Sequence, residues 1–258
     1  MTFGILQEMT IEEVREFKPE LALLGVGSTE PHGPAMTYGT DYFNCDAGCR
    51  AAVLKANARG ARVLMYPTLP IGNNVNFKEF PFAARIRVRT LMHVVLDIIK
   101  ALEEDGIRKI VIRNGHGGNI DALNAALREH FEITPPDRRA FVCIPGGMGG
   151  PATVGLVVHP SVHGGESELS QLMHTRPDCV RFDKIRDLPI ESPRAGVGKL
   201  DKTFYIRPWH LYMPESAGGN VSQASAEKGK LLFDGGISGF ADFLVELARA
   251  EWRPGFPY

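Results

Sequence analysis

LALLGV, at residues 21–26, is an unbroken run of apolar and small residues. A strand that buries only one face alternates apolar and polar residues, whereas a continuous apolar run is typical of a strand buried on both faces. Three further short strands are predicted, from RVLMY at 62–66, KIVI at 109–112 and AFVCI at 140–144. A strand buried on both faces indicates a sheet that is covered on both sides.

Helical segments separate these strands. Apolar residues recur at helical spacing over Val88–Glu104 and Ile120–Phe131, and a further helix is expected over 42–58. Thr10 and Glu13 form a capping box that opens a short helix near the N-terminus. Alternating strands and helices predict an α/β fold with a mainly parallel central sheet between two helical layers, a three-layer αβα arrangement.

The later part of the chain gives weaker signals. Residues 222–252 are expected to be mostly helical, with a break at Gly235–Gly236. Residues 181–212 combine prolines with mixed polarity, which predicts an irregular segment near the site or at a subunit contact. Since no internal repeat or low-complexity linker occurs, we expect a single domain over residues 1–258.

Composition argues against several classes of protein. The 258 residues are 44% apolar, enough for a full core, and the formal net charge of −1 gives no basis for binding nucleic acid or an anionic membrane. No secretory signal or membrane-spanning stretch is recognisable. The four cysteines, Cys45 and Cys49 among them, do not form a disulfide framework. We therefore expect a cytoplasmic protein that acts on a small-molecule substrate.

The first group of chemically active residues follows the first strand, in GVGSTEPHGPAMTYGTD at 25–41. Side chains two residues apart in an extended segment point the same way, so Glu30 and His32 can converge on one site. Asp41 could join them or could simply cap the helix expected from Tyr42. Carboxylate and imidazole ligands in this mixture suit zinc, manganese or iron.

The second group lies in IVIRNGHGGN at 110–119, again just past a strand. The glycines around His116 let the backbone approach a ligand closely. A phosphate-binding loop is the alternative, but the Gly-Lys-Ser/Thr ending of a Walker loop and the dinucleotide-binding spacing are both absent. We interpret His116 as a metal ligand, and the backbone amides around Gly117 as contacts for a substrate oxyanion.

The third group, HPSVHGGESELS at 159–170, brings His163, Glu166 and Glu168 within six residues. A helix is expected to begin near Glu166, where a carboxylate also favours the helix N-terminus. The two glutamates point about 200° apart on a helix, so only one should face the metals. The other histidines are interpreted as structural; they are His93, His130, His159 and His174.

All three groups fall where ligands bind in open α/β sheets, at the carboxyl ends of the strands. Glu30, Asp41 and Glu168 together carry a charge of −3, which two divalent metals and one bridging hydroxide would neutralise. A single metal would leave the buried cluster anionic and more costly to bury. The charge balance therefore favours two divalent metal ions per chain, with zinc, manganese and iron as the options.

Five stretches occur in the order typical of one family: GSTEPHG at 27–33, GTD at 39–41, NGHGGN at 114–119, HGGESE at 163–168 and ASAEKG at 224–229. They resemble the creatininase (creatinine amidohydrolase) family over nearly the whole chain. The resemblance implies a single hydrolase domain with a binuclear centre. In that centre Glu30 and His116 would hold one metal, His32 would hold the other, and Asp41 would bridge them.

One ligand of the family pattern is missing, because the glutamate expected two residues after His116 is Gly118 here. Glu168 is expected to supply the replacement ligand, with Glu166 as the alternative. Glu166 is also expected, with His163, to be a catalytic residue. The resemblance also implies a homo-oligomer, for which a hexamer is common in the family.

The resemblance leaves the substrate open. Family members hydrolyse creatinine, a formylated pyrimidine nucleotide intermediate, a precursor peptide or a keto-inositol. Creatinine enzymes carry tryptophans near the third motif, whereas Trp209 and Trp252 both lie elsewhere in this sequence, which argues against creatinine. Asn73, Asn74 and Lys78 are predicted to bind a substrate rich in hydroxyl groups.

Amide C–N hydrolysis is the family default. A metal-bound hydroxide would attack a carbonyl of a small cyclic polar substrate, with His163 protonating the leaving group. The alternative is ring-opening C–C hydrolysis of a cyclic keto-sugar of the 3-dehydro-scyllo-inosose type. A non-catalytic metal-binding protein would need no proton donor such as His163, and a nucleotide-binding protein would depend on the glycine loops alone.

Overall fold

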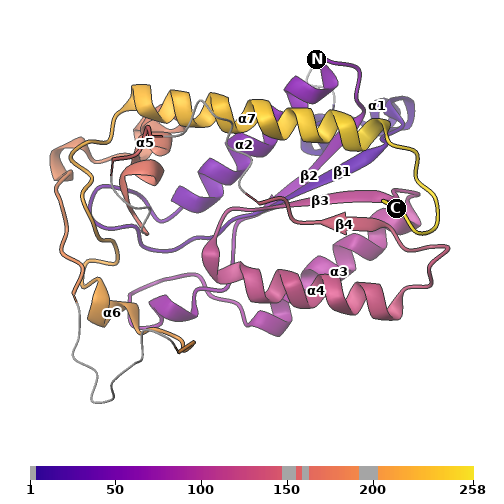
Figure 1. Cartoon of the computed structure of the whole chain (residues 1–258). Coiled ribbons are helices and arrows are strands. Elements are labelled where there is room, and N and C mark those ends of the chain that lie inside the picture. Colours follow the sequence, from indigo (N-terminus) through magenta and orange to yellow (C-terminus); the bar gives the residue numbers. More distant parts are fainter. Residues whose placement is uncertain (1–3, 147–154, 159–162, 192–202) are drawn as a thin grey trace.

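The computed structural model describes residues 4–146, 155–158, 163–191 and 203–258 and places helices on both faces of one sheet (Figure 1). In the described part of the chain the sheet has four parallel strands in the order β2-β1-β3-β4. The strands are β1 Leu21–Val26, β2 Val63–Leu69, β3 Lys109–Asn114 and β4 Phe141–Cys143. The predicted α/β fold with a parallel central sheet is confirmed.

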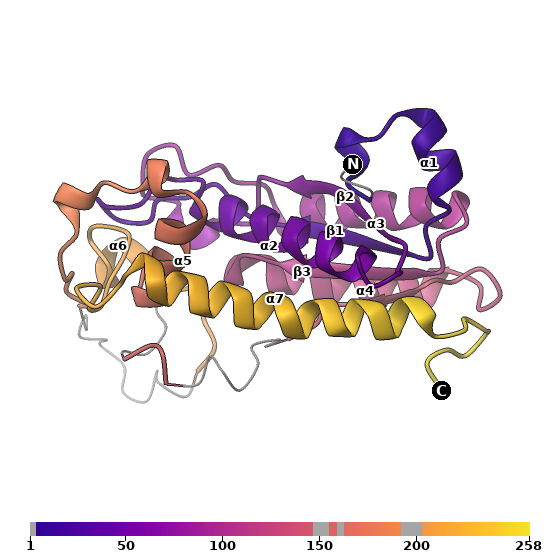
Figure 2. The same cartoon turned by 90° about the horizontal axis from the view of Figure 1, so that it is seen from above.

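The two faces of the sheet are covered by different helix pairs, as Figures 1 and 2 show. Helices α2 and α7 lie on one face, and α3 and α4 on the other. Successive residues of β1 point to opposite faces, so Leu23 enters the core under α2 and α7 while Leu24 enters the core over α3 and α4. The bounds are α2 Thr40–Asn57, α3 Val88–Glu104, α4 Ile120–Ile133 and α7 Ala226–Arg249.

The remaining elements are short. They are η1 Leu6–Glu8, α1 Ile11–Phe17, η2 Val75–Phe77, η3 Gly117–Asn119, α5 Glu166–Thr175, η5 Pro177–Cys179, η6 Phe182–Lys184 and α6 Trp209–Tyr212. The capping box of Thr10 and Glu13 at the start of α1 is confirmed. The break expected at Gly235–Gly236 is wrong, because α7 continues through both glycines.

The end of β1 lies directly against the start of α2. A Cβ atom on Gly27 would lie 2.7 Å from the Cα of Tyr42, so only glycine permits this approach. The same packing brings the first turn of α2, which carries Asp41, to the carboxyl end of the sheet. Cys45 and Cys49 follow on α2 as buried free thiols in the apolar core, as expected of structural residues.

The opposite end of the sheet holds the C-terminus of α7. Lys109 opens β3, is only 5% exposed, and directs its ammonium group at the last turn of α7. Its Nζ donates hydrogen bonds of 2.9, 2.6 and 2.8 Å to the carbonyl oxygens of Leu247, Ala248 and Ala250. A cation at a helix C-terminus is favourable, so Lys109 ties α7 to the sheet.

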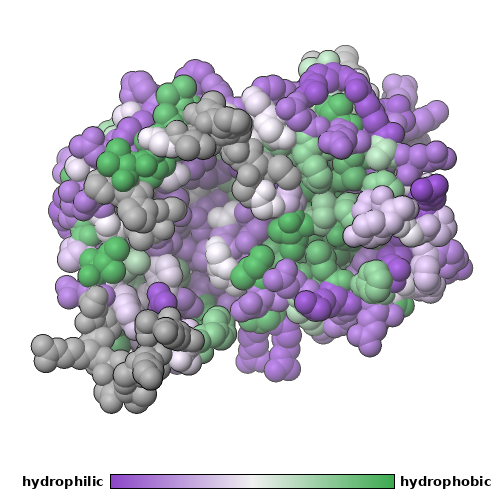
Figure 3. Space-filling view, viewed as in Figure 1, coloured by the Kyte–Doolittle hydropathy of each residue, from purple (hydrophilic) through white to green (hydrophobic). Residues whose placement is uncertain are grey.

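The outer edge of the sheet borders a surface groove. It runs beside β4, between α4 and the C-terminal segment, and is lined among others by Phe131, Phe141, Trp252 and Phe256. In Figure 3, hydrophobic side chains gather in the middle of this face and are surrounded by hydrophilic ones.

No described helix combines the length and apolar character that crossing a membrane would require.

Candidate metal centre

The predicted ligands come together from four separate segments. Glu30 and His32 lie in the loop after β1, Asp41 in the first turn of α2, His116 after β3, and Glu168 in the first turn of α5. They meet at the carboxyl ends of the strands. The sequence motifs predicted the site at this end of the strands.

Asp41 stands between two sets of potential ligands. Its Oδ1 lies 3.2 Å from Nε2 of His32, and its Oδ2 lies 3.0 Å from Nδ1 of His116. Glu30 completes a set with Asp41 and His116, and Glu168 completes a set with His32 and Asp41; within each set the ligand atoms lie within 4.8 Å of one another. One carboxylate is therefore shared by two groups that could each hold a metal ion, and Glu30, His32 and His163 form a third group of this kind.

Glu30 supplies an independent indication of a cation. Its side chain is fully buried, and its Oε2 accepts a hydrogen bond of 3.1 Å from Ser28 Oγ. Its Oε1 lies 3.1 Å from Nδ1 of His116 yet accepts no hydrogen bond. A buried carboxylate oxygen without a donor is costly, and a cation shared with Asp41 and His116 would satisfy it. Carboxylate oxygens and imidazole nitrogens are suitable ligands for zinc, manganese or iron.

The three histidines at the site are oriented as metal-binding histidines usually are. Each uses one ring nitrogen to donate a hydrogen bond to a backbone carbonyl and directs the other nitrogen at the carboxylates. Such bonds fix the tautomer and leave the second nitrogen free to bind a metal. The pairs are His32 Nδ1 with Glu30 O at 2.9 Å, His116 Nε2 with Asn73 O at 3.1 Å, and His163 Nε2 with Pro31 O at 2.9 Å.

Without a metal, the carboxylates hold protons on two of these rings. Burial alone would lower the pKa of both, but Asp41 outweighs it and raises the pKa of His32 to about 9. Asp41 and Glu30 together raise the pKa of His116 to about 10. Burial would raise the pKa of Asp41, but the charge of His32 and its bonds to both histidines hold it well below the usual value. The metal-free site is thus a network of ion pairs.

Burial has the larger effect on the other acids and on the third histidine. Burial raises the pKa of Glu30, and it raises the pKa of Glu168 to about 7. His163 is buried beside the charged His32 ring, and both effects hold its pKa well below 6.5. His163 is therefore neutral at pH 7, with a lone pair on Nδ1 that lies 3.5 Å from Oε1 of Glu30.

An aromatic cluster encloses His163. Its ring centroid lies 4.7 Å from that of Phe77, 5.1 Å from that of Trp209 and 4.2 Å from that of His32. Phe77 and Trp209 also contact each other, at 5.0 Å. The sequence argument against creatinine assumed that no tryptophan lies near the third motif. That premise is wrong, because folding brings Trp209 against His163 from 46 residues further along the chain.

Phe77 was not predicted as a site residue. A signal was available, since Phe77 lies one residue before Lys78, which was predicted to bind substrate, but an apolar side chain is ordinarily found in the core. It is only 2% exposed, so the core interpretation is also correct. Phe77 forms the buried floor of the cluster, while Trp209 is half-buried at its rim.

Two of the predicted substrate contacts, Asn73 and Asn74, direct their side-chain amides at the protein's own backbone. Asn73 uses its side-chain amide to donate to Ile86 O at 2.9 Å, and the Asn74 amide donates to the carbonyl oxygens of Thr29 and Ala84. Oδ1 of Asn74 accepts from Ser28 Oγ at 2.6 Å. These buried amides hold loops in place and satisfy backbone groups, so their side chains are not offered to a substrate. Of the other two, Lys78 and Gly117 are both exposed.

Glu166 does not face the ligands. Its Oε1 lies 2.6 Å from Nζ of Lys228, and it belongs to neither of the sets built around Asp41. The expected opposition of the two glutamates on α5 is correct, and Glu168 is the one that faces His32, with Oε2 at 3.7 Å from Nε2. The alternative role of Glu166 as a ligand, and its role as a catalytic residue, therefore lack geometric support.

Position 118, where the family pattern has a glutamate, is crowded in this chain. A Cβ atom at position 118 would lie 2.2 Å from the carbonyl oxygen of Asn73 and 2.4 Å from Nε2 of His116. No side chain fits there without moving the backbone or His116. Gly117, by contrast, has open space beside it.

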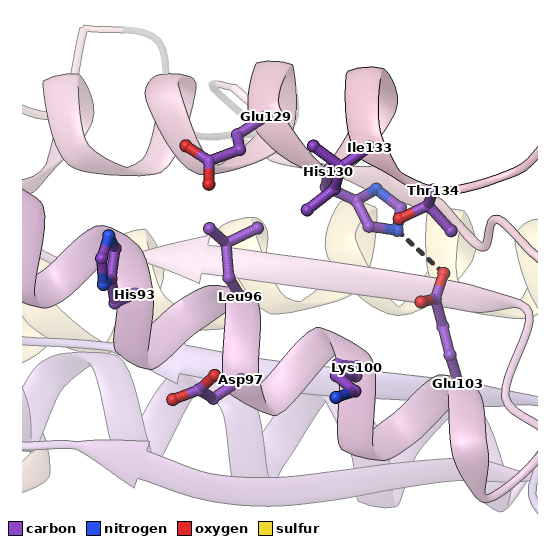
Figure 4. Close-up of a pocket in the computed structure, with 9 residues that line it drawn as sticks. All are labelled: His93, Leu96, Asp97, Lys100, Glu103, Glu129, His130, Ile133 and Thr134. Atoms are coloured by element: carbon purple, nitrogen blue, oxygen red, sulfur yellow. Dashed lines mark hydrogen bonds and ion pairs between the residues drawn. The ribbon is translucent and has the colours of Figure 1, made fainter.

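The histidines expected to be structural lie away from the centre. Nε2 of His130 donates a hydrogen bond of 2.8 Å to Oε1 of Glu103 in a pocket between α3 and α4, which His93 also lines (Figure 4). His174 packs against Phe233. None of the described residues in this pocket belongs to a group able to hold a metal. His159 lies outside the described residues.

The site can be compared with known proteins. A family model described as creatinine amidohydrolase, of the Creatininase family, matches residues 7–244. The chain is 28% identical over 240 residues to the creatinine amidohydrolase of Pseudomonas putida, covering 87% of this chain and 88% of that protein. It is 26% identical over 237 residues to a mycofactocin precursor peptide peptidase of Mycobacterium ulcerans (strain Agy99), covering 90% and 86%.

A third relative has another kind of substrate. The 3-dehydro-scyllo-inosose hydrolase of Thermotoga maritima is 24% identical over 264 residues, covering 94% of this chain and 82% of that protein. The described fold also matches solved structures. A Bacteroides fragilis protein provisionally named creatinine amidohydrolase has a TM-score of 0.81 at 26% identity, with 98% and 99% coverage. A mutant creatininase of Zn-Zn type has a TM-score of 0.74 at 25% identity, with 95% and 98% coverage.

Proposed function

This chain belongs to the creatininase family, and on that basis we propose that it is a hydrolase that uses two divalent metal ions per chain to cleave an amide C–N bond. Zinc, manganese or iron would serve. The observation that carries the proposal is the position of Asp41, whose two carboxylate oxygens face two different histidines and so divide the ligands into two sets.

The metals would be held by Glu30, Asp41 and His116 in one set and by His32, Asp41 and Glu168 in the other. When bound, divalent metals lower the pKa of water and polarise a carbonyl group, which is the chemistry that amide hydrolysis requires. The bonds from the histidines to backbone carbonyls fix the direction of each coordinating nitrogen before any metal arrives.

His163 would move the proton. It is neutral at pH 7, and Nδ1 faces the centre while Nε2 is fixed to Pro31 O. A neutral imidazole can accept a proton at Nδ1 from the attacking water and pass it to the leaving nitrogen.

The substrate would be small, polar and cyclic. Trp209 and Phe77 form an apolar wall beside His163, which suits the flat face of a ring. Gly117, whose backbone amide is the proposed oxyanion contact, is exposed and directly follows His116 in the chain. Creatinine is again a substrate to be tested, because the argument against it failed. The ring-opening of a keto-sugar rests on similarity to the Thermotoga protein alone, since the amides of Asn73 and Asn74 are engaged elsewhere.

The experiment is a substrate screen with zinc-, manganese- and iron-loaded protein. Creatinine and related cyclic amides, short peptides and a keto-inositol are supplied, and product is followed by mass spectrometry. Metal-dependent hydrolysis of an amide that is lost in Asp41→Ala supports the proposal. A protein that holds two metals and hydrolyses none of these classes favours a non-catalytic metal-binding function. Nucleotide-induced stabilisation that persists after chelation would favour the nucleotide-binding class.

We also propose that the protein is a homo-oligomer, with the hexamer as the first form to test. The support is family membership. Light scattering coupled to size-exclusion chromatography gives the number of subunits, and a monomer at micromolar concentration would contradict this part of the proposal.

A further inference from the structure

Lys228 and Glu166 form an ion pair that joins the first turns of α7 and α5. The Nζ of Lys228 lies 2.6 Å from Oε1 of Glu166, whose side chain is 1% exposed. Oε2 of Glu166 also accepts the backbone N–H of Val158 at 3.0 Å. A buried carboxylate depends on its partners, because removing the cation leaves a buried charge without compensation.

The packing of the two helices fixes where Lys228 points. A Cβ atom on Gly229 would lie 1.8 Å from the carbonyl oxygen of Ser170, so only glycine lets α7 come this close to α5. The hydroxyl oxygen of Ser170 accepts a hydrogen bond of 3.2 Å from the backbone N–H of Ser225. Ser225 in turn caps α7 by accepting from the backbone N–H of Lys228 at 3.2 Å.

Glu168 lies on the opposite side of the same turn of α5. Residues two apart on a helix are about 200° apart around its axis. The side that carries Glu166 faces α7, and the side that carries Glu168 faces His32, 3.7 Å away. The rotation of this turn about the helix axis therefore decides whether Glu168 reaches the centre.

We propose that Lys228 is a positioning residue that acts through Glu166 to set the rotation of α5 and so presents Glu168 to His32 and Asp41. This inference rests on the proposed function, because it concerns the binding of metal at that set. It gives a role to Glu166 and to the ASAEKG stretch at 224–229, neither of which the proposed chemistry uses.

The inference predicts an asymmetry between the two metal sets. The set formed by Glu30, Asp41 and His116 takes its ligands from the β1 loop, α2 and the β3 loop, and none of these ligands lies on α5. The other set includes Glu168 on α5. Loss of the ion pair should therefore weaken one zinc site and spare the other.

The test is a calorimetric titration of metal-free protein with zinc in the presence of a competing chelator. Wild type is expected to bind two zinc ions. Lys228→Met should keep one of them at wild-type affinity and bind the other about 10- to 100-fold more weakly, the range found when partners that orient metal ligands are removed. Lys228→Arg, which keeps the charge, should restore the second site.

The matched control is Lys230→Met, the same substitution two residues along α7. Lys230 pairs with Asp234 at the surface, and its loss should change neither affinity. If Lys228→Met does not fold, Glu166→Gln keeps the side-chain volume and should weaken the same site.

Three results would contradict either the inference about Lys228 or the proposed function. A lower melting temperature for Lys228→Met with both zinc affinities unchanged would overturn the inference and leave the ion pair a structural feature. Equal weakening of both sites would also overturn it. Wild-type protein that binds no zinc would overturn the proposed function itself. This outcome is distinguishable from failure of the inference, because it appears in the wild-type titration before any variant is compared.

Discussion

Raising the pH from 7 to 8 should tighten the binding of each zinc ion at least tenfold. In the metal-free protein the pKa is about 9 for His32 and about 10 for His116, so both rings carry a proton at pH 7. A ring must lose the proton from its coordinating nitrogen before it can bind a metal. Each set contains one of these histidines, so each stepwise affinity should rise at least tenfold per pH unit while its ring remains protonated in the metal-free state. The set with Glu168 should have the steeper slope near pH 7, because the pKa of that carboxyl is about 7.

The stability of the metal-free protein should follow the opposite trend. A histidine whose folded pKa is raised stabilises the fold fully below its unfolded pKa, about 6.5, and loses this contribution as the pH rises through the folded value. For His32 and His116 the loss should occur between about pH 6.5 and pH 10. The melting temperature of chelator-treated protein should therefore fall over this range while zinc affinity rises.

Calorimetry in two buffers of different ionisation enthalpy measures the protons released per zinc. At pH 7 we expect about one proton for the metal held by Glu30, Asp41 and His116. We expect more than one for the metal held by His32, Asp41 and Glu168, because the Glu168 carboxyl, with a pKa of about 7, is also partly protonated. Titrations between pH 6.5 and 8 then give the slope of affinity against pH. Zinc binding with no proton release and with the same affinity at every pH would show that neither histidine is a ligand, and the assignment of the two sets would be wrong.

Further substitutions test other parts of the structure. His163→Ala should keep both metals and lower kcat by 10²- to 10⁴-fold, about the contribution of a general acid–base; an unchanged kcat would remove its role. Gly118→Ala should displace Asn73 or His116 and weaken zinc binding, whereas Gly117→Ala should not, and equal behaviour of the two would contradict the steric argument. Lys109→Met should lower the free energy of unfolding by about 3 kcal/mol in urea titrations, because three bonds that end α7 are lost; a change under about 1 kcal/mol would refute this.

The strands and the ligand motifs were predictable because both depend on local sequence. The apolar run at 21–26 is buried along its whole length in β1, as its pattern requires. The motifs containing Glu30, His32 and His116 follow strands, and the parallel sheet brings the ends of its strands together at one edge. Residues two apart on a helix point in nearly opposite directions, so helix geometry alone predicted that Glu166 and Glu168 face different sides of α5.

The surroundings of the site were less predictable because they depend on contacts between distant segments. Trp209 reaches His163 only through the packing of α6 on η2, which no local pattern reveals. Asn73 and Asn74 look the same in sequence whether their amides bind substrate or backbone, and only the fold shows that they bind backbone. The glycines of α7 suggested a break because an isolated helix disfavours them, but close packing of α7 on α2 and α5 stabilises the helix.

Metal content per chain, measured by elemental mass spectrometry on wild type and Asp41→Ala, tests the central claim most directly. Asp41 is shared by both sets, so its loss should affect both ions. The account predicts about two divalent metals per chain in wild type and nearly none in folded Asp41→Ala. Wild-type protein that stays folded and binds no zinc, manganese or iron, or an Asp41→Ala variant that retains both ions, would contradict it.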